Sequence, residues 1–135
     1  IGRRCEIGPF AKIRTGSRIG NGAVIGSFVE VVRSKVGEKT CVKHLSYIGD
    51  ARIGNKVNVG AGTVTANFDG RRKHQTVVRD RALLGCDTVL VAPVTIGTGA
   101  RTGAGAVVCA RHTVPAGRTV VGVPARVMKR SRKGR

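Results

Sequence analysis

The first 32 residues divide into six-residue units that read IGRRCE, IGPFAK, IRTGSR, IGNGAV, IGSFVE and the start of a sixth, VV. Each unit opens with isoleucine or valine, and glycine often follows. The spacing then continues through the chain, with one-residue slips after Val31 and Ile48 and an interruption between Val59 and Val78. Thr102 is the one polar member of the row, which consists of Ile1, Ile7, Ile13, Ile19, Ile25, Val31, Val36, Val42, Ile48, Ile53, Val59, Val78, Leu84, Leu90, Ile96, Thr102, Val108, Val114 and Val120.

This period of six excludes an α-helix and a coiled coil, whose hydrophobic patterns repeat every 3.6 or 7 residues. Alternation over four or five residues followed by a turn with glycine predicts a short strand and a corner. Stacked corners form a hexapeptide β-helix, in which the aliphatic side chains point inward and pack on their equivalents in the next coil. The alternative is a β-sandwich, but sandwich strands recur at a longer spacing of about 8–12 residues.

The composition fits one folded domain with a strong positive charge. The 135 residues include 25 Lys and Arg against 7 Asp and Glu, a net charge of +18, and 41% are hydrophobic. This hydrophobic content excludes a disordered basic tail, and glycine does not occupy every third position as in collagen. No apolar run is long enough to cross a membrane and no signal peptide is visible, so we expect a cytoplasmic protein. The chain starts within a repeat and without Met, so we expect it to be part of a longer protein.

We expect two parts. Residues 1–121 form the β-helix, interrupted by an inserted loop at 65–76, and residues 122–135 form a C-terminal arm and basic tail. The loop carries three consecutive basic residues, a histidine, an asparagine and one of the four aromatics, and insertions in such solenoids often lie on the binding face. The tail holds six basic residues between positions 126 and 135 and no aromatic. This favours a solvated end over a contact with nucleic acid.

The cysteines Cys5, Cys41, Cys86 and Cys109 lie far apart, with no CxxC pair. This spacing does not suit a zinc finger, and we expect no metal site. We expect four small buried hydrophobic residues and no disulfide.

Several segments resemble a more particular family within the hexapeptide-repeat acyltransferase superfamily. Residues 43–50 read KHLSYIGD, residues 58–63 read NVGAGT, residues 67–70 read NFDG and residues 91–94 read VAPV. From about Ile7 to Val108 the chain resembles the acetyltransferase domain of the bifunctional glucosamine-1-phosphate acetyltransferase/N-acetylglucosamine-1-phosphate uridyltransferases. The resemblance implies an all-β, left-handed parallel β-helix that forms a homotrimer.

The resemblance also implies an activity. Members of the family transfer acetyl from acetyl-CoA, a cosubstrate, to glucosamine 1-phosphate, and a related amino-sugar phosphate is a further candidate acceptor. The product, N-acetylglucosamine 1-phosphate, serves the synthesis of UDP-N-acetylglucosamine for the cell envelope. We expect small-molecule partners and no membrane or nucleic-acid partner. Magnesium is expected only if a nucleotidyltransferase domain lies upstream.

The catalytic roles follow from the same resemblance, position by position. His44 would be the general base, since an imidazole titrates near working pH. Glu30 would lie close to His44 and orient it. Asn67 would bind the sugar near the reacting amine, and the backbone around Phe68 would stabilise the oxyanion. No covalent intermediate is needed, because the amine can attack the thioester directly.

Binding roles are implied for a second group of residues. Arg14 and Lys73 would hold the sugar phosphate, because fixed cations are suited to a dianion. Tyr47 and Asn58 would contact the sugar. The positions implied for cofactor binding are Ala61, Phe68, Cys86 and Ala104.

Four positions depart from the family pattern, and they motivate alternatives. Val32 stands where a second basic phosphate contact is expected, and Arg33 or Lys35 could replace it. Phe68 replaces a tyrosine, Cys86 a serine and Gly122 an arginine. The second hypothesis is therefore a non-catalytic β-helix module that trimerises a sugar-nucleotide enzyme. A third is a polyanion-binding module that acts through the basic tail.

Overall fold

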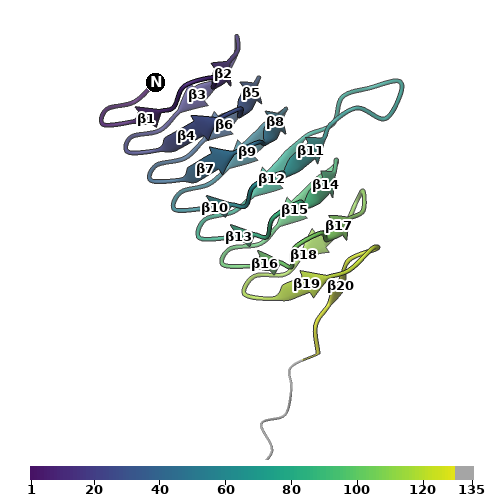
Figure 1. Cartoon of the computed structure of the whole chain (residues 1–135). Helices are drawn as coiled ribbons and strands as arrows, with labels where there is room; N and C mark the ends of the chain where they lie inside the picture. Colours follow the sequence, from purple (N-terminus) through teal and green to yellow (C-terminus); the bar gives the residue numbers. More distant parts are fainter. Residues whose placement is uncertain (130–135) are drawn as a thin grey trace, which may run out of the picture.

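The computed structural model describes residues 1–129 as a stack of short strands in three parallel sheets (Figure 1). Sheet A contains β1 (Glu6–Ile7), β4 (Val24–Ser27), β7 (Cys41–His44), β10 (Asn58–Val59), β13 (Leu83–Leu84), β16 (Arg101–Thr102), β19 (Thr119–Val121) and β20 (Arg126–Val127). Sheet B contains β2 (Lys12–Ile13), β5 (Glu30–Val32), β8 (Tyr47–Gly49), β11 (Val64–Ala66), β14 (Val89–Val91) and β17 (Val107–Val108). Sheet C contains β3 (Arg18–Ile19), β6 (Lys35–Val36), β9 (Ala51–Ile53), β12 (Thr76–Val78), β15 (Val94–Ile96) and β18 (Thr113–Val114).

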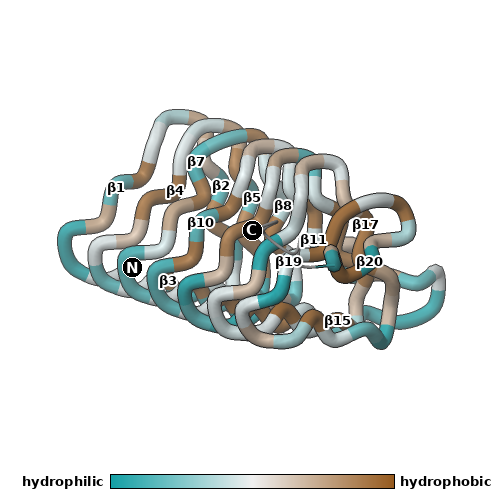
Figure 2. The backbone as a smooth tube through the Cα atoms, turned by 90° about the horizontal axis from the view of Figure 1, so that it is seen from below, coloured by the Kyte–Doolittle hydropathy of each residue, from teal (hydrophilic) through white to brown (hydrophobic). Residues whose placement is uncertain are grey.

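Each coil runs through one strand of each sheet and then returns to sheet A. Six coils follow one another from β1 to β18, and each strand pairs in parallel with its equivalents one coil before and after. Only β20 runs antiparallel, against β19. The predicted left-handed parallel β-helix is therefore confirmed, and hydrophilic segments recur at the same corner of successive coils (Figure 2). We name the corners A–B, B–C and C–A after the sheets that they join.

The repeat row forms the core. From Ile19 to Val120 every member of the row is buried, including Thr102, whose hydroxyl lies 2.7 Å from that of Thr88. The row begins exposed, at Ile1 and Ile7, because these residues lie at the N-terminal end of the stack and have a neighbouring coil on one side only. Inward packing of branched side chains thus explains the period of six.

The irregularities of the repeat all fall on the B–C corner. The two slips correspond to short corners after β5 and β8, where Arg33 and Asp50 adopt left-handed conformations with φ of 46° and 47°. The interruption leaves the same corner one coil later, between β11 and β12, and projects from the stack (Figure 1). The loop is shorter than the expected 65–76: its ends belong to β11 and β12, so it comprises residues 67–75.

The prediction of buried cysteines is wrong: Cys86 is exposed and the other three are half-buried, although all four are free as expected. Within the expected arm, β20 adds to sheet A, and most of the basic tail (residues 130–135) lies outside the described residues. The part of the chain that the structure describes has no helix capable of crossing a membrane.

Candidate functional site

The outer face of sheet B gathers several of the predicted site residues. Glu30 on β5 pairs in register with Tyr47 on β8, and Lys12 on β2 precedes it. Arg14 leaves the end of β2, and its Nη1 donates a hydrogen bond to Glu30 Oε1 at 2.9 Å. Both side chains are partly exposed, at 51% and 33%. The arrangement places a carboxylate, a guanidinium and a phenol within three neighbouring coils.

The B–C corner supplies a hydrogen-bonded chain that continues this group. Arg33 holds Asp50 through two bonds, from Nε at 2.7 Å and from Nη2 at 2.8 Å. Asp50 Oδ2 in turn accepts a bond from Asn67 Nδ2 at 2.5 Å, and Asn67 Nδ2 lies 3.4 Å from the Tyr47 hydroxyl. The bond from Arg33 is the largest cause that lowers the pKa of Asp50, and the Asn67 amide adds to it. This chain fixes Asn67 at the base of the inserted loop.

The loop has an internal turn built on Asp69. Its Oδ1 accepts bonds from the backbone N–H groups of Arg71 and Arg72, and its Oδ2 lies 2.6 Å from His74 Nε2. These contacts, led by the Arg72 N–H, lower the pKa of Asp69. An antiparallel bridge joins Phe68 to Lys73. The loop is therefore ordered by its own contacts and holds Lys73 next to Phe68.

His44 lies at the other side of sheet B, where sheet A turns into it. It ends β7, pairs with Ser27 and is exposed. The corner beyond it carries exposed apolar residues: Leu45, and the stacked rings of Phe10 and Phe28, whose centroids are 5.2 Å apart. An accessible imidazole beside an apolar ridge can accept a proton from a ligand bound over this corner.

The hydrogen bond that Glu30 makes in the structure differs from the expected contact with His44. No hydrogen bond joins these two side chains among residues 1–129, and the Glu30 carboxylate instead accepts from Arg14. Because Glu30 lies on sheet B and His44 at the end of a sheet A strand, a molecule bound at the A–B corner could contact both. The orienting role of Glu30 therefore stays a prediction.

Three of the positions predicted to bind the cofactor form a line along the A–B corner. Ala61, Cys86 and Ala104 occupy equivalent places in three successive coils, where backbone bonds link Asp87 N to Ala61 O at 2.7 Å and Gly105 N to Cys86 O at 2.8 Å. All three side chains are small and at least partly exposed. A shallow line of small residues along the stack fits a long, thin molecule such as acetyl-CoA. Asn58, on β10, is exposed on sheet A one coil beyond His44.

Sequence reasoning missed the structural role of Arg33 and Asp50. The sequence did contain a signal for this role, because each residue stands at a slip of the repeat. The two residues are 17 positions apart, which is the length of one shortened coil. Neither of the two residues considered as replacements for the missing cation takes the place of Val32. Arg33 is bound to Asp50, and Lys35 lies on sheet C, whereas Val32 itself is buried.

Comparisons with known proteins agree with this architecture. A family model described as bacterial transferase hexapeptide (six repeats) matches residues 1–33. The bifunctional protein GlmU of Dichelobacter nodosus is 56% identical over 108 residues, which are 80% of this chain and 23% of that protein. GlmU of Acidithiobacillus ferrooxidans is 48% identical over 128 residues, which are 95% of this chain and 28% of that protein. This chain is a hexapeptide-repeat β-helix related to GlmU. It spans about a quarter of the length of these curated relatives.

Solved structures show the same fold. The acetyltransferase domain of PglB from Neisseria gonorrhoeae, in complex with acetyl coenzyme A, superposes with a TM-score of 0.78 at 25% identity, covering 92% of this chain and 57% of that one. A mutant GDP-perosamine N-acetyl transferase from Caulobacter crescentus, in complex with CoA and GDP-perosamine, gives 0.79 at 24% identity with the same coverage. The second likeness concerns the fold alone.

Proposed function

We propose that this chain is an acetyl-CoA-dependent N-acetyltransferase that acts on glucosamine 1-phosphate or a closely related amino-sugar phosphate. The observation that carries the proposal is the position of His44: it is exposed where sheet A meets sheet B, between the Arg14–Glu30 group and the line of small residues on the A–B corner. The similarity to GlmU across this region supports the choice of substrate.

In the proposed reaction the sugar amine attacks the thioester carbonyl directly. A C–N bond forms, the C–S bond breaks and CoA leaves as the thiol. His44 takes the proton that the nitrogen loses as the C–N bond forms and gives it to the sulfur of CoA as the C–S bond breaks. The amide of Asn67, fixed by Asp50, positions the sugar, and the backbone near Phe68 stabilises the negative charge on the carbonyl oxygen.

The phosphate of the acceptor requires cations, and the loop and sheet B provide two. Lys73 reaches the site from the loop, where its backbone is bridged to Phe68. Arg14 is partly exposed and can contact a phosphate while it keeps one bond to Glu30. Tyr47 and Asn58 flank the same region and would contact the sugar ring. With Val32 buried, these two cations carry the phosphate contact.

We also propose a homotrimer, the assembly that the family resemblance implies. The outer row of sheet B in the later coils is apolar, with Val64, Val89 and Val107 in register. The apolar ridge of Phe10, Phe28 and Leu45 lies at the neighbouring corner. A second copy that covered these surfaces would remove them from water. A cytoplasmic location and an upstream magnesium-dependent domain stay predictions.

The test is release of free CoA thiol from acetyl-CoA in the presence of glucosamine 1-phosphate, with galactosamine 1-phosphate and glucosamine 6-phosphate in parallel. Release that depends on the 1-phosphate sugar is expected. Size-exclusion chromatography with light scattering reports the assembly in the same sample. An intact trimer that releases no thiol with any of the three sugars would contradict the enzyme and favour the non-catalytic module.

A further inference from the structure

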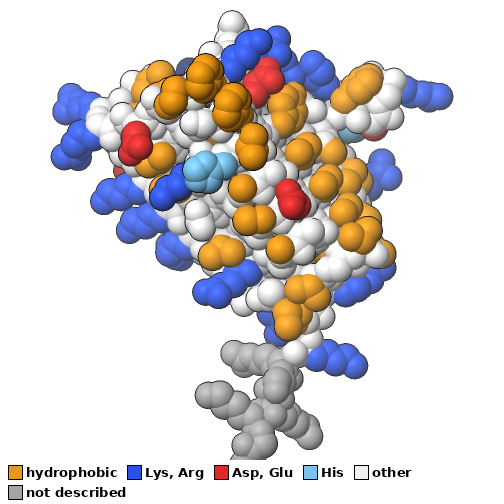
Figure 3. Space-filling model, in the orientation of Figure 1, with side chains coloured by type: hydrophobic (Ala, Val, Ile, Leu, Met, Phe, Trp, Pro, Cys, Tyr) orange, Lys and Arg blue, Asp and Glu red, His pale blue; other side chains and the backbone are white. Residues whose placement is uncertain are grey.

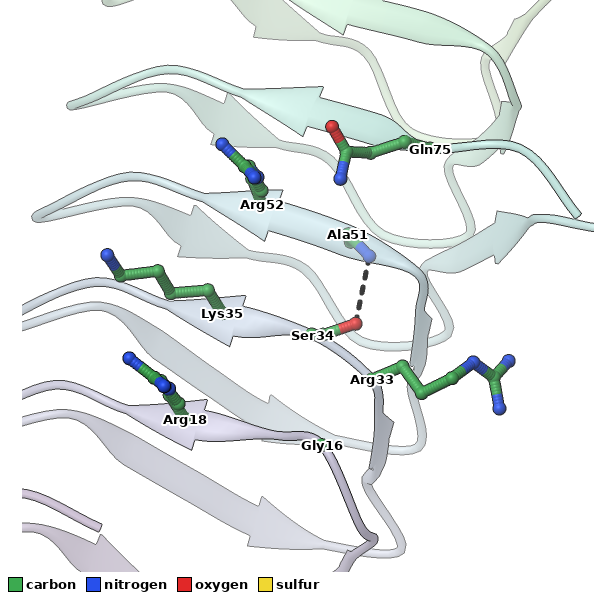
Figure 4. Close-up of a pocket in the computed structure, with 8 residues that line it drawn as sticks. All are labelled: Gly16, Arg18, Arg33, Ser34, Lys35, Ala51, Arg52 and Gln75. Carbon is green, nitrogen blue, oxygen red and sulfur yellow. Dashed lines mark hydrogen bonds between the residues drawn. The ribbon is translucent and has the colours of Figure 1, made fainter.

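Sheet C carries a row of cations on its outer face. Arg18 on β3, Lys35 on β6 and Arg52 on β9 are directly opposite one another in successive parallel strands. All three side chains are exposed. Neighbouring strands lie about 4.8 Å apart, so the row places three positive charges on a line about 10 Å long. Figure 4 shows them pointing in the same direction from adjacent strands.

The repulsion among these charges lowers the stability of the free protein. Like charges directly opposite each other in a sheet repel and destabilise it. Within residues 1–129 the ion pairs are formed by Arg14, Arg33 and His74, and none involves a member of this row. Within the described residues, no ion pair therefore offsets the repulsion among the three charges.

A hollow of about 350 Å³ lies along this row. It is lined by Arg18, Lys35 and Arg52, by the Gln75 amide and by Arg33 at its edge, and no carboxylate is among its lining side chains in the described chain. Arg33 points away from the row, toward its partner Asp50, whereas Gln75 points toward Arg52 (Figure 4). The hollow thus offers three unpaired cations and one neutral hydrogen-bonding group.

We propose that the sheet C row, Arg18, Lys35 and Arg52, binds a linear oligophosphate. Consecutive phosphoryl groups place negative charges at short intervals along a line, so that a chain of them can contact all three cations at once, with charge-assisted hydrogen bonds to each. A single orthophosphate is too short to contact both ends of the row. The three cations of the row lie on sheet C, whereas the proposed acetyl-transfer site lies on sheets A and B and on the inserted loop, and the hollow borders that site at Arg33 and Gln75.

Other polyanions fit this face less well. Single-stranded nucleic acid is usually held by aromatic side chains that stack on bases. The four aromatics of this chain, Phe10, Phe28, Tyr47 and Phe68, lie on the A–B corner, sheet B and the loop. An anionic membrane usually also receives apolar side chains, and none of the exposed large hydrophobic residues of the described chain lies on a strand of sheet C.

The test compares two triple variants that remove the same net charge. One is Arg18→Gln/Lys35→Gln/Arg52→Gln. The control is Arg101→Gln/Arg111→Gln/Arg118→Gln, which removes three exposed cations from the later coils. Titration calorimetry with inorganic tripolyphosphate at low salt should show affinity reduced about tenfold or more in the first variant and less than about twofold in the control. Orthophosphate should bind the unmodified protein more weakly than tripolyphosphate.

The shift in Tm on ligand addition distinguishes a loss of binding from a folding defect. Tripolyphosphate should raise the Tm of the unmodified protein and of the control by similar amounts, and that of the sheet C variant by much less. Equal loss of affinity in both variants would overturn the proposal, because binding would then follow net charge alone. Loss of binding to duplex DNA or anionic vesicles in the sheet C variant, with tripolyphosphate binding unchanged, would also overturn it.

Discussion

Asn67 Nδ2 donates a hydrogen bond to Asp50 Oδ2 at 2.5 Å, so the first residue of the inserted loop is held by the corner of the preceding coil. Asp50 is itself held by Arg33 one coil earlier. Three successive B–C corners therefore cooperate to place one amide. Asn67 is nearly buried, at 8% exposure, which further restricts its orientation. A loop residue thus gains the rigidity of the β-helix, as positioning of a reacting amine requires.

This arrangement predicts a pH-dependent contribution to stability. Because Arg33 lowers the folded-state pKa of Asp50 below its unfolded value of about 3.9, ionised Asp50 stabilises the fold above about pH 4. That stabilisation is lost as pH falls through the folded-state pKa. We expect Asp50→Asn to lower the Tm clearly at pH 7 and progressively less below pH 4.

A double-mutant cycle assigns the effect to the ion pair. Thermal unfolding of Arg33→Gln, Asp50→Asn and the double variant should give a coupling energy at pH 7 that shrinks on acidification. A coupling energy that stays constant between pH 7 and pH 3 would contradict this account.

The β-helix core predicts losses of stability of different size for two adjacent leucines on β13. Leu84 points inward and is 1% exposed, whereas Leu83 points outward and is 37% exposed. Leu84→Ala should lower the free energy of unfolding by about 2–4 kcal/mol, through lost burial and a cavity, and Leu83→Ala by less than about 1 kcal/mol. Urea denaturation measures both. Similar losses in the two variants would show that the inward row is wrongly assigned.

The proposed binding of acetyl-CoA along the line of small residues predicts a separation of the two Michaelis constants. Ala104→Leu adds a bulky side chain to the A–B corner and should raise the KM for acetyl-CoA about tenfold or more, with the KM for the sugar phosphate little changed. Ala116→Leu, at the exposed C–A corner of the same coil, is the matched control. Steady-state kinetics with each substrate varied in turn distinguishes them. An unchanged KM for acetyl-CoA in the Ala104 variant would place the cofactor elsewhere.

The phosphate contact predicts the converse pattern. Arg14→Gln removes a guanidinium group that also donates a hydrogen bond to Glu30. Because a contact to the phosphate is lost, the KM for the amino-sugar phosphate should rise by about tenfold, with the KM for acetyl-CoA unchanged. Lys56→Gln removes an exposed cation from the C–A corner, away from the proposed site, and serves as the control. Equal effects of the two substitutions would indicate general electrostatic attraction in place of a specific contact.

The sequence predicted the strands and the inward row because one local rule, an aliphatic residue every sixth position, repeats through the chain. Thr102, the one polar member of the row, is also compatible with this rule, because its buried hydroxyl pairs with that of Thr88 in the preceding coil. The cysteine prediction failed because hydrophobicity was used without register. Cys41 directly precedes the inward Val42 on β7 and so points outward.

The site was predicted less completely, because its contacts join different coils. Arg14 and Glu30 are 16 residues apart, and Arg33 and Asp50 are 17 apart. Such pairs become visible only when the corner lengths, which vary along the chain, are known. The row on sheet C depends on the same register and was missed for the same reason.

A pair of histidine variants tests whether His44 is the base in acetyl transfer. CoA thiol release with glucosamine 1-phosphate should fall by about 10²–10⁴-fold in His44→Ala. His112→Ala, which removes another exposed histidine from the sixth coil, should retain full activity. Both variants should keep the Tm and the oligomeric state of the unmodified protein. Activity of the His44 variant equal to that of the His112 variant would contradict the account.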